Sequence, residues 1–193
     1  TKVPQPPAPD IPEGMVNVGP STVHTTTGYP LTKREDYQTL RYLFENTSFE
    51  INRQAIDDAI DAVGDDGVVT LAGGPCSPIY NLINNYTGLE QFIFDLSDFP
   101  EEVEATMSIM AEKNYEWYQL AASASPTALI RCTDDLDSKM ISPAMYETYA
   151  APCLKRYVDI CHQNAKTFIL HMCGHIKEFL PAIKDAGVDA IHC

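Results

Sequence analysis

Apolar residues along this chain follow two alternating patterns, which together predict its secondary structure. Short, continuous apolar runs rich in β-branched residues are typical of strands buried on both faces. Longer segments in which apolar residues recur every three or four positions are typical of helices. Strands are predicted at 68–72, 128–132, 167–170 and 188–192, and helices at 34–45, 52–63, 98–122, from 143 onwards and at 176–187. This alternation predicts a parallel sheet with crossover helices.

Residues with strong positional preferences mark where several of these helices begin and end. Asp98 and Glu101 have the spacing of a capping box at a helix N-terminus. Ser142 is predicted to cap the next helix, and Pro152 inside that helix is predicted to kink it. Gly187 is typical of the position just after a helix C-terminus.

The order of the elements predicts an α/β fold, and we favour a (β/α)8 TIM barrel over an open, doubly wound sheet. No glycine-rich dinucleotide-binding turn follows any predicted strand. A complete barrel needs about 250 residues, whereas this chain has 193 residues and only four convincing strands. We therefore expect an incomplete barrel domain over residues 33–193, a proline-rich extended segment at 1–32, and a chain that is a fragment.

Charge and composition exclude several classes of function. The chain has 27 acidic and 13 basic residues, so its formal net charge of −14 disfavours nucleic acid or an anionic membrane as partner. It contains no apolar run of about 18 residues, and no signal segment opens it. Its six cysteines lack the spacing of a disulfide framework, so we expect reduced thiols and a cytoplasmic location.

Thiols and imidazoles gather at the carboxyl ends of the predicted strands, where parallel α/β folds place their active sites. The turn after the first strand contains Cys76, and the second strand ends at Cys132. The third strand leads into His171 and Cys173, and the last strand ends in a histidine and a cysteine at 192–193. This clustering is the main functional signal in the sequence.

His171 and Cys173 are candidate metal ligands. They lie two residues apart on extended chain, so both side chains point to the same side. Imidazole nitrogen and thiolate sulfur are ligands that zinc prefers, and a catalytic zinc takes three protein ligands and keeps a fourth position open. The structural alternative is a buried, hydrogen-bonded histidine beside a cysteine that serves as a small apolar residue.

For the other candidate residues, both a functional and a structural interpretation are possible. Asp134 and Asp135 follow the second strand and are candidates for a general acid or base, or for cation binding. Aspartates in such a loop also commonly stiffen the backbone ahead of a helix cap. Cys76 either faces the pocket or packs as a small residue. His162 has no partner in the pattern and is expected on the surface, and Cys153 is expected in the core.

Seven short motifs cover about two thirds of the chain, from about residue 68 to 193. They are Leu-Ala-Gly-Gly-Pro at 71–75, Gly-Leu-Glu-Gln-Phe at 88–92, Asp-Phe-Pro-Glu-Glu at 98–102, Asp-Asp-Leu at 134–136, Ile-Ser-Pro-Ala-Met at 141–145, Leu-His-Met-Cys-Gly at 170–174 and Gly-Val-Asp-Ala-Ile at 187–191. The series resembles the uroporphyrinogen decarboxylase superfamily, specifically its branch of cobalamin-dependent (corrinoid) methyltransferases. The resemblance implies a (β/α)8 barrel with its pocket at the carboxyl ends of the strands.

The His-x-Cys pair is similar to that of the zinc-binding branch, in which methyl groups pass between a corrinoid and a thiol or similar acceptor. The resemblance implies zinc at His171 and Cys173, and methylcobalamin as the methyl source, either free or on a small corrinoid protein. It also implies a third zinc ligand, a cysteine beyond residue 193. Cys193, at the end of the adjacent strand, is an alternative third ligand within the chain.

The remaining tasks of such a site fall to four residues. Asp134 or Asp135 is expected to take the acceptor's proton or to position the acceptor. Gly74 and Cys76, at the end of the first strand, are assigned to cofactor binding. The acceptor itself, the oligomeric state and the identity of the methyl donor stay open.

Two other functions remain open as well. One is a metal-free decarboxylase of a tetrapyrrole or related acid. The decarboxylases place a tyrosine that would fall at Asn81, with Tyr80 one position early. A substrate with many carboxylates also requires several basic residues, and Arg131 is the only one in a strand near this rim. The other is a non-catalytic fragment or scaffold that retains the fold.

Overall fold

A computed structural model describes residues 15–17, 24–26 and 28–192. Within the segment predicted to be extended, strand β1 (Met15–Asn17) pairs antiparallel with strand β2 (His24–Thr26). Most of that segment and Cys193 lie outside the described residues, so its boundary at residue 32 stays a prediction. Where the chain is described, its helices are all too short or too polar to cross a membrane.

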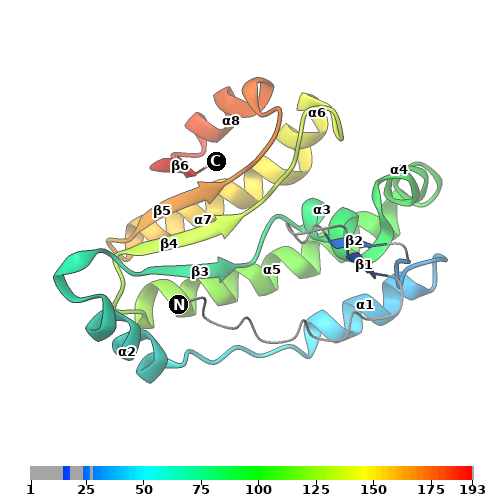
Figure 1. The fold of residues 1–193 in the computed structure, drawn as a ribbon. Coiled ribbons are helices and arrows are strands. Elements are labelled where there is room, and N and C mark those ends of the chain that lie inside the picture. The colour runs from blue at the N-terminus through cyan, green and yellow to red at the C-terminus, as the bar shows by residue number, and fades with distance from the viewer. Residues whose placement is uncertain (1–14, 18–23, 27, 193) are drawn as a thin grey trace.

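Four parallel strands form the sheet that organises the molecule (Figure 1). They are β3 (Thr70–Gly74), β4 (Leu129–Thr133), β5 (Thr167–His171) and β6 (Ala190–His192). Each strand pairs with its neighbour in the chain, and a helical segment connects each pair. This arrangement confirms the predicted α/β fold as part of a (β/α)8 barrel, with the described strands forming an open arc.

The first strand lies two residues later than predicted. Val68 is 77% exposed, and pairing with β4 begins only at Thr70. Gly73 and Gly74, which lie beyond the predicted end of this strand at residue 72, belong to it. Gly73 has a φ of 87°, a conformation that suits glycine, and the register shifts between Leu71 and Gly74. This irregularity returns Gly74 to the ladder opposite Cys132.

Two helices precede the sheet, close to their predicted bounds: α1 (Asp36–Glu45) and α2 (Arg53–Val63). Asn52 caps α2, because its side-chain oxygen accepts the N–H of Ala55 at 3.1 Å. A single 3₁₀ turn (Gly64–Asp66) then leads towards β3.

The crossover from β3 to β4 contains α3 (Pro78–Asn81), a π-helical segment (Leu82–Thr87), α4 (Leu89–Asp98) and α5 (Pro100–Ala124). The capping box predicted at Asp98 and Glu101 is wrong. Asp98 is the last residue of α4, and the break falls at Phe99, which has an extended φ of −146° and caps α5 without a side-chain hydrogen bond. Pro100 begins α5, where its missing N–H costs nothing.

The crossover from β4 to β5 contains α6 (Pro143–Met145), a π-helical segment (Tyr146–Ala150) and α7 (Ala151–Gln163). The predicted cap is confirmed: the Ser142 hydroxyl accepts the N–H of Met145 at 3.2 Å. The disturbance predicted at Pro152 takes the form of the wide π turn that immediately precedes α7. A 3₁₀ turn (Lys177–Phe179) and α8 (Leu180–Asp185) then lead to β6.

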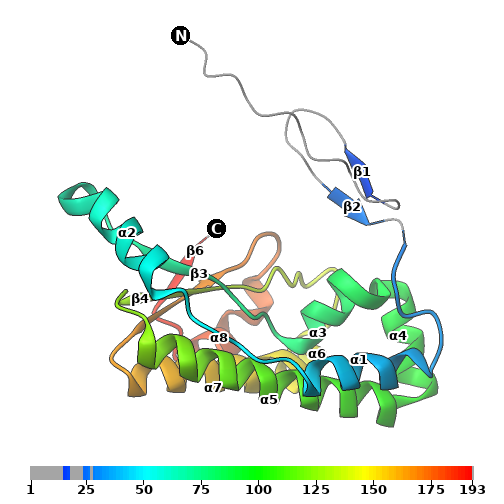
Figure 2. The same ribbon diagram turned by 90° about the horizontal axis from the view of Figure 1, so that it is seen from below.

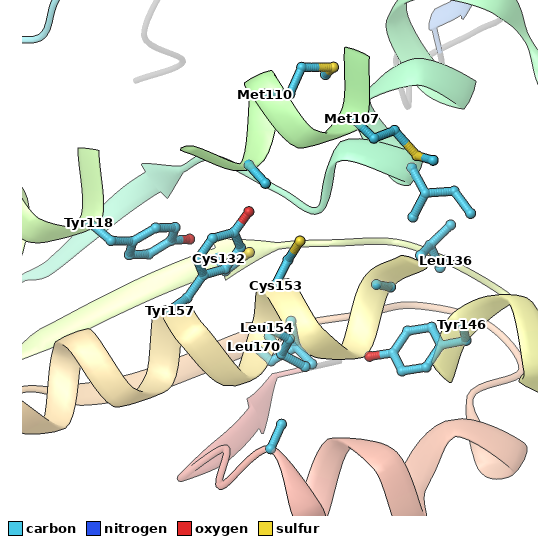
Figure 3. Packing of buried hydrophobic residues seen from close by; sticks show 14 of the residues in the cluster. Met107, Met110, Tyr118, Cys132, Leu136, Tyr146, Cys153, Leu154, Tyr157 and Leu170 are labelled. Carbon is cyan, nitrogen blue, oxygen red and sulfur yellow. The ribbon is translucent and has the colours of Figure 1, made fainter. Parts of the chain in front are cut away.

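Helices α1, α5 and α7 lie side by side as one layer along the sheet (Figure 2). Every second residue of β4 and β5 is buried towards this layer, and the residues between them are only partly buried. Figure 3 shows Tyr118 of α5 and Tyr157 of α7 next to Cys132 of β4, with the two rings stacked at 4.2 Å between centroids. Cys153 is buried in the same core, as predicted. The opposite face of the sheet is the one that carries the site.

Candidate functional site

Three residues form a row across the carboxyl end of the sheet. Thr133 of β4 pairs with His171 of β5, which pairs in turn with His192 of β6. The residue before His171, Leu170, is buried towards the helices, so His171 points to the opposite face. Its Nδ1 atom lies 2.7 Å from Nδ1 of His192.

Cys173 lies next to His171, as the two-residue spacing predicts. Its Sγ atom is 3.4 Å from Nε2 of His171, within hydrogen-bonding range for sulfur. The Cys173 side chain is exposed, and that of His171 is 21% exposed. The structural alternative of a buried histidine therefore does not describe this pair.

Asp135 is the third member of the cluster. Its Oδ1 atom is 3.7 Å from Nε2 of His171 and accepts the backbone N–H of Cys173 at 2.9 Å. One ligand atom from each of Asp135, His171 and Cys173 lies within 4.8 Å of the others. The sequence alone did not join Asp135 to the pair, although the adjacency of the two strand ends would have pointed to it.

The donor set suits zinc. Bonds of about 2.0–2.3 Å at tetrahedral angles place neighbouring donor atoms about 3.4–3.6 Å apart. The separations from His171 Nε2, 3.4 Å to sulfur and 3.7 Å to carboxylate oxygen, are close to this requirement, and all three donor atoms lie within 4.8 Å of one another, so a bound metal would draw Asp135 and Cys173 closer together. Three protein donors would leave a fourth position for another ligand, which is the arrangement of catalytic rather than structural zinc sites. Cys193, the alternative third ligand, lies outside the described residues.

Asp134 sits behind the cluster rather than in it. Its side chain is buried, with the residue 1% exposed, and its Oδ1 atom accepts the Ser77 hydroxyl at 2.9 Å. Burial raises the pKa of Asp134 to about 7, and the negative charge of Asp135 acts in the same direction, whereas the hydrogen bond from Ser77 opposes it. The carboxyl group therefore exchanges its proton near neutral pH.

Comparison with known protein families identifies the family of this chain. A family model described as Uroporphyrinogen decarboxylase (URO-D) matches residues 16–193. The chain belongs to the uroporphyrinogen decarboxylase family. A search of curated proteins found no match. The family includes decarboxylases and related methyltransferases, so membership indicates an enzyme of one of these kinds.

In this member of the uroporphyrinogen decarboxylase family, the two residues assigned to cofactor binding are Gly74, the last residue of β3, and Cys76 in the turn that follows. Gly74 is buried: a Cβ atom there would lie 2.7 Å from the Tyr118 hydroxyl and 3.0 Å from the Trp117 ring. Cys76 is partly exposed, and burial raises the pKa of its thiol, with Asp134 adding to the shift. Close packing explains the glycine, and the assignment of both residues to a cofactor stays a prediction.

Tyr80 of α3 lies close enough to the cluster for its charges to act on the phenol, which the sequence did not predict. Burial raises the pKa of its phenol to about 12, and the negative charge of Asp135 is the next largest cause. The groups of Cys76, Asp134 and Cys173 act in the same direction. The family resemblance would place a tyrosine one position later, at Asn81, but the fold brings Tyr80 to the site.

A second acidic residue joins the two strand-end loops. Asp137 Oδ2 accepts the backbone N–H of His175 at 2.8 Å, and Oδ1 accepts that of Lys139 at 2.7 Å. These backbone hydrogen bonds lower the pKa of Asp137 to about 2. Stiffening of the loop, one of the two interpretations of its aspartates, therefore describes Asp137. Away from the site, His162 is exposed as predicted, but it does have a partner in Asp189.

Proposed function

We propose that this protein is a zinc-dependent methyltransferase that moves a methyl group between a corrinoid and a thiol or similar acceptor. The observation that carries the proposal is the approach of Asp135, His171 and Cys173 at the carboxyl end of the sheet. A thiolate, an imidazole and a carboxylate together form a donor set of the catalytic zinc type. Family membership supports the proposal because the family includes related methyltransferases.

Each residue of the cluster has a distinct task in this proposal. His171 and Cys173 hold the metal, and Asp135 contributes a third donor while its hydrogen bond to the Cys173 N–H keeps the two loops together. When bound, zinc would lower the pKa of a coordinated acceptor thiol and so favour the nucleophilic thiolate. Asp135, with its side chain 31% exposed, is accessible to an acceptor and is the carboxylate placed to take its proton. Asp134 is shielded from the acceptor by its burial.

The methyl donor in this proposal is methylcobalamin, either free or carried by a small corrinoid protein. Gly74 at the end of β3 and Cys76 in the turn that follows are the residues proposed to face it. Arg131 lies on the half-buried face of β4, two residues before Thr133, and is the basic residue of that strand. It is the only Lys or Arg within the described strands β3 to β6, and a substrate with many carboxylates would require several such cations.

Metal-free decarboxylation is the second candidate function, and Tyr80 is the observation that favours it. A tyrosine close to the strand-end cluster is a feature that the resemblance implies for the decarboxylases, and Tyr80 supplies one despite the shift of one position in sequence. Such an enzyme would release carbon dioxide from a tetrapyrrole or related acid without zinc and would keep its activity in a chelator.

The deciding experiment measures zinc and methyl transfer together. The purified protein is expected to bind about one zinc per chain and to demethylate methylcobalamin in the presence of a thiol. Cys173→Ala and His171→Ala are each expected to lose zinc and to reduce the rate at least 100-fold, since each removes a ligand. His162→Ala removes an exposed imidazole far from the cluster and is the matched control, expected to behave as the unaltered protein.

Two outcomes would contradict the proposal. One is a purified protein that contains no zinc and acquires none, together with methyl transfer that survives His171→Ala. The other is release of carbon dioxide from a porphyrinogen at a rate that a chelator does not change, which would establish the decarboxylase. Absence of binding to zinc, thiol and corrinoid alike would instead indicate a scaffold.

A further inference from the structure

The contact between His171 and His192 joins β5 to β6 through side chains as well as backbone. The two residues are paired in the parallel ladder, and their rings lie 4.8 Å apart between centroids. Their Nδ1 atoms are 2.7 Å apart, a distance short enough for a strong N–H···N hydrogen bond. Such a bond requires that one Nδ1 carries a proton and that the other does not.

The contacts of Nε2, on the other side of the His171 ring, bear on the direction of this hydrogen bond. Nε2 lies 3.4 Å from Sγ of Cys173, which can donate or accept, and 3.7 Å from Asp135, beyond hydrogen-bonding distance. Two arrangements satisfy these contacts: either Nε2 accepts from the thiol and Nδ1–H donates to His192, or both roles are reversed. Only the first arrangement leaves a lone pair on Nε2 for a metal, and in it His192 accepts at its own Nδ1 and carries its own proton on Nε2.

We propose that His192 is a positioning residue that holds His171 in the Nδ1–H tautomer, with the Nε2 lone pair turned towards Asp135 and Cys173. Metal-binding histidines commonly donate their second ring N–H to a fixed acceptor, which sets both the tautomer and the ring orientation. Here the acceptor is a second imidazole on the neighbouring strand. The expected effect of His192 on zinc binding rests on the proposed function. The expected tautomer of His171 can be tested without it.

The first measurement follows the His171 tautomer in the metal-free protein. Long-range ¹H–¹⁵N correlation spectra distinguish a protonated from an unprotonated ring nitrogen, and His171→Gln identifies the signals. The unaltered protein is expected to show the Nδ1–H tautomer. His192→Phe keeps an aromatic ring but removes the acceptor, so His171 is expected to shift to a mixture of tautomers. His192→Asn restores an acceptor oxygen near the position of Nδ1 and is expected to restore the tautomer.

The second measurement is zinc affinity by competition with a chelating dye. His192→Phe is expected to bind zinc about 10- to 100-fold more weakly than the unaltered protein, and His192→Asn within a few fold of it. Ile191→Ala is the matched control, because it perturbs the same short strand as the His192 variants. Ile191 pairs with Leu170, which faces the helices, so its side chain does not lie beside the His171 ring. Zinc affinity in that variant is expected to change less than about threefold.

An unchanged His171 tautomer in His192→Phe would overturn the inference. Equal loss of affinity in His192→Phe, His192→Asn and Ile191→Ala would also overturn it, because it would show that β6 acts only as a strand. If the unaltered protein binds no zinc, the proposed function fails, while the tautomer spectra still decide the role of His192.

Discussion

At the scale of single residues, the turn after β3 depends on side chains that satisfy its carbonyl groups. The Tyr118 hydroxyl donates to the Pro75 carbonyl at 2.9 Å, and Asn114 donates to the Cys76 carbonyl, also at 2.9 Å. These donors are buried, so the carbonyl groups that the ladder no longer pairs are not left without partners. The turn that contains Cys76 therefore has a defined backbone conformation.

Gly74→Ala tests how closely this turn is packed. The new Cβ would lie 2.7 Å from the Tyr118 hydroxyl, which is fully buried and already hydrogen-bonded. We expect a loss of about 1–3 kcal/mol in the free energy of unfolding, measured by urea denaturation, because the ring cannot move without breaking that bond. Gly67→Ala is the control: its nearest neighbour would be at 3.4 Å, so its stability is expected to change by less than about 0.5 kcal/mol. Equal stability of both variants would contradict the prediction.

At the scale of elements, Asp189 ties the start of β5 to the end of α7 and to the approach to β6. Its Oδ2 atom accepts the backbone N–H of Phe168 at 2.7 Å and Nε2–H of His162 at 2.9 Å. Partial burial acts to raise the pKa of Asp189, but these two hydrogen bonds hold it below its ordinary value. One carboxylate, in the loop between α8 and β6, therefore links α7 to β5.

The stability of this link is expected to depend on pH. A carboxyl group with a lowered pKa in the folded protein stabilises the fold above the ordinary carboxyl pKa, and this contribution is lost as the pH falls through the folded value. Asp189→Asn is expected to lower the free energy of unfolding by about 1 kcal/mol or less at pH 7, given its partly exposed position. The difference from the unaltered protein is expected to shrink below about pH 4. Urea denaturation at several pH values measures it.

Asp61→Asn is the control for loss of a charge alone. Asp61 is exposed on α2, so its substitution is expected to change stability little at any of these pH values. A difference between Asp189→Asn and the unaltered protein that stays constant down to pH 2 would show that the link does not depend on the charge of Asp189.

At the scale of the whole molecule, electrostatic repulsion is the dominant consequence of the composition. The formal net charge is −14 over 193 residues. Ion pairs such as Arg41–Glu102 at 2.7 Å and Lys155–Asp159 at 3.0 Å offset little of it, since partly exposed pairs contribute only modestly. Repulsion among like charges destabilises a compact state, and dissolved salt screens it.

The melting temperature is therefore expected to rise with ionic strength. Between about 20 mM and about 300 mM NaCl the Debye length falls from about 20 Å to about 6 Å, and we expect an increase of a few degrees in calorimetry or circular dichroism. KCl is expected to give the same increase, because the effect is one of screening. A melting temperature that falls with salt would mean that the ion pairs outweigh the repulsion.

The repeating order of strand and helix was predictable because it depends on local patterns. The β-branched runs marked β4 and β5 almost to the residue, and Ser142 marked its helix. Errors arose where tertiary structure overrides a local rule. Gly73 belongs to a strand because its positive φ allows an irregular ladder, and Asp98 ends one helix rather than beginning the next. Pro152 predicted a disturbance of its helix, but nothing in the sequence predicted that this would take the form of a π turn.

Only the part of the candidate site whose residues lie close together along the chain was predictable. His171 and Cys173 meet because they are two residues apart on extended chain. Asp135 and His192 are 36 and 21 positions from His171, and only the register of β4, β5 and β6 brings them to the same rim. That register depends on packing of the whole sheet against its helices, so it cannot be deduced from spacing along the chain.

The sequential order of the strands also bears on biosynthesis. Each of β4, β5 and β6 pairs with a strand that lies earlier in the chain, so a ribosome delivers every one of them to a partner already made. Asp135 would emerge first, His171 and Cys173 next, and His192 last. The histidine proposed to orient the cluster is thus the final part to arrive, and a nascent chain would acquire its ligand atoms before the contact that aligns them.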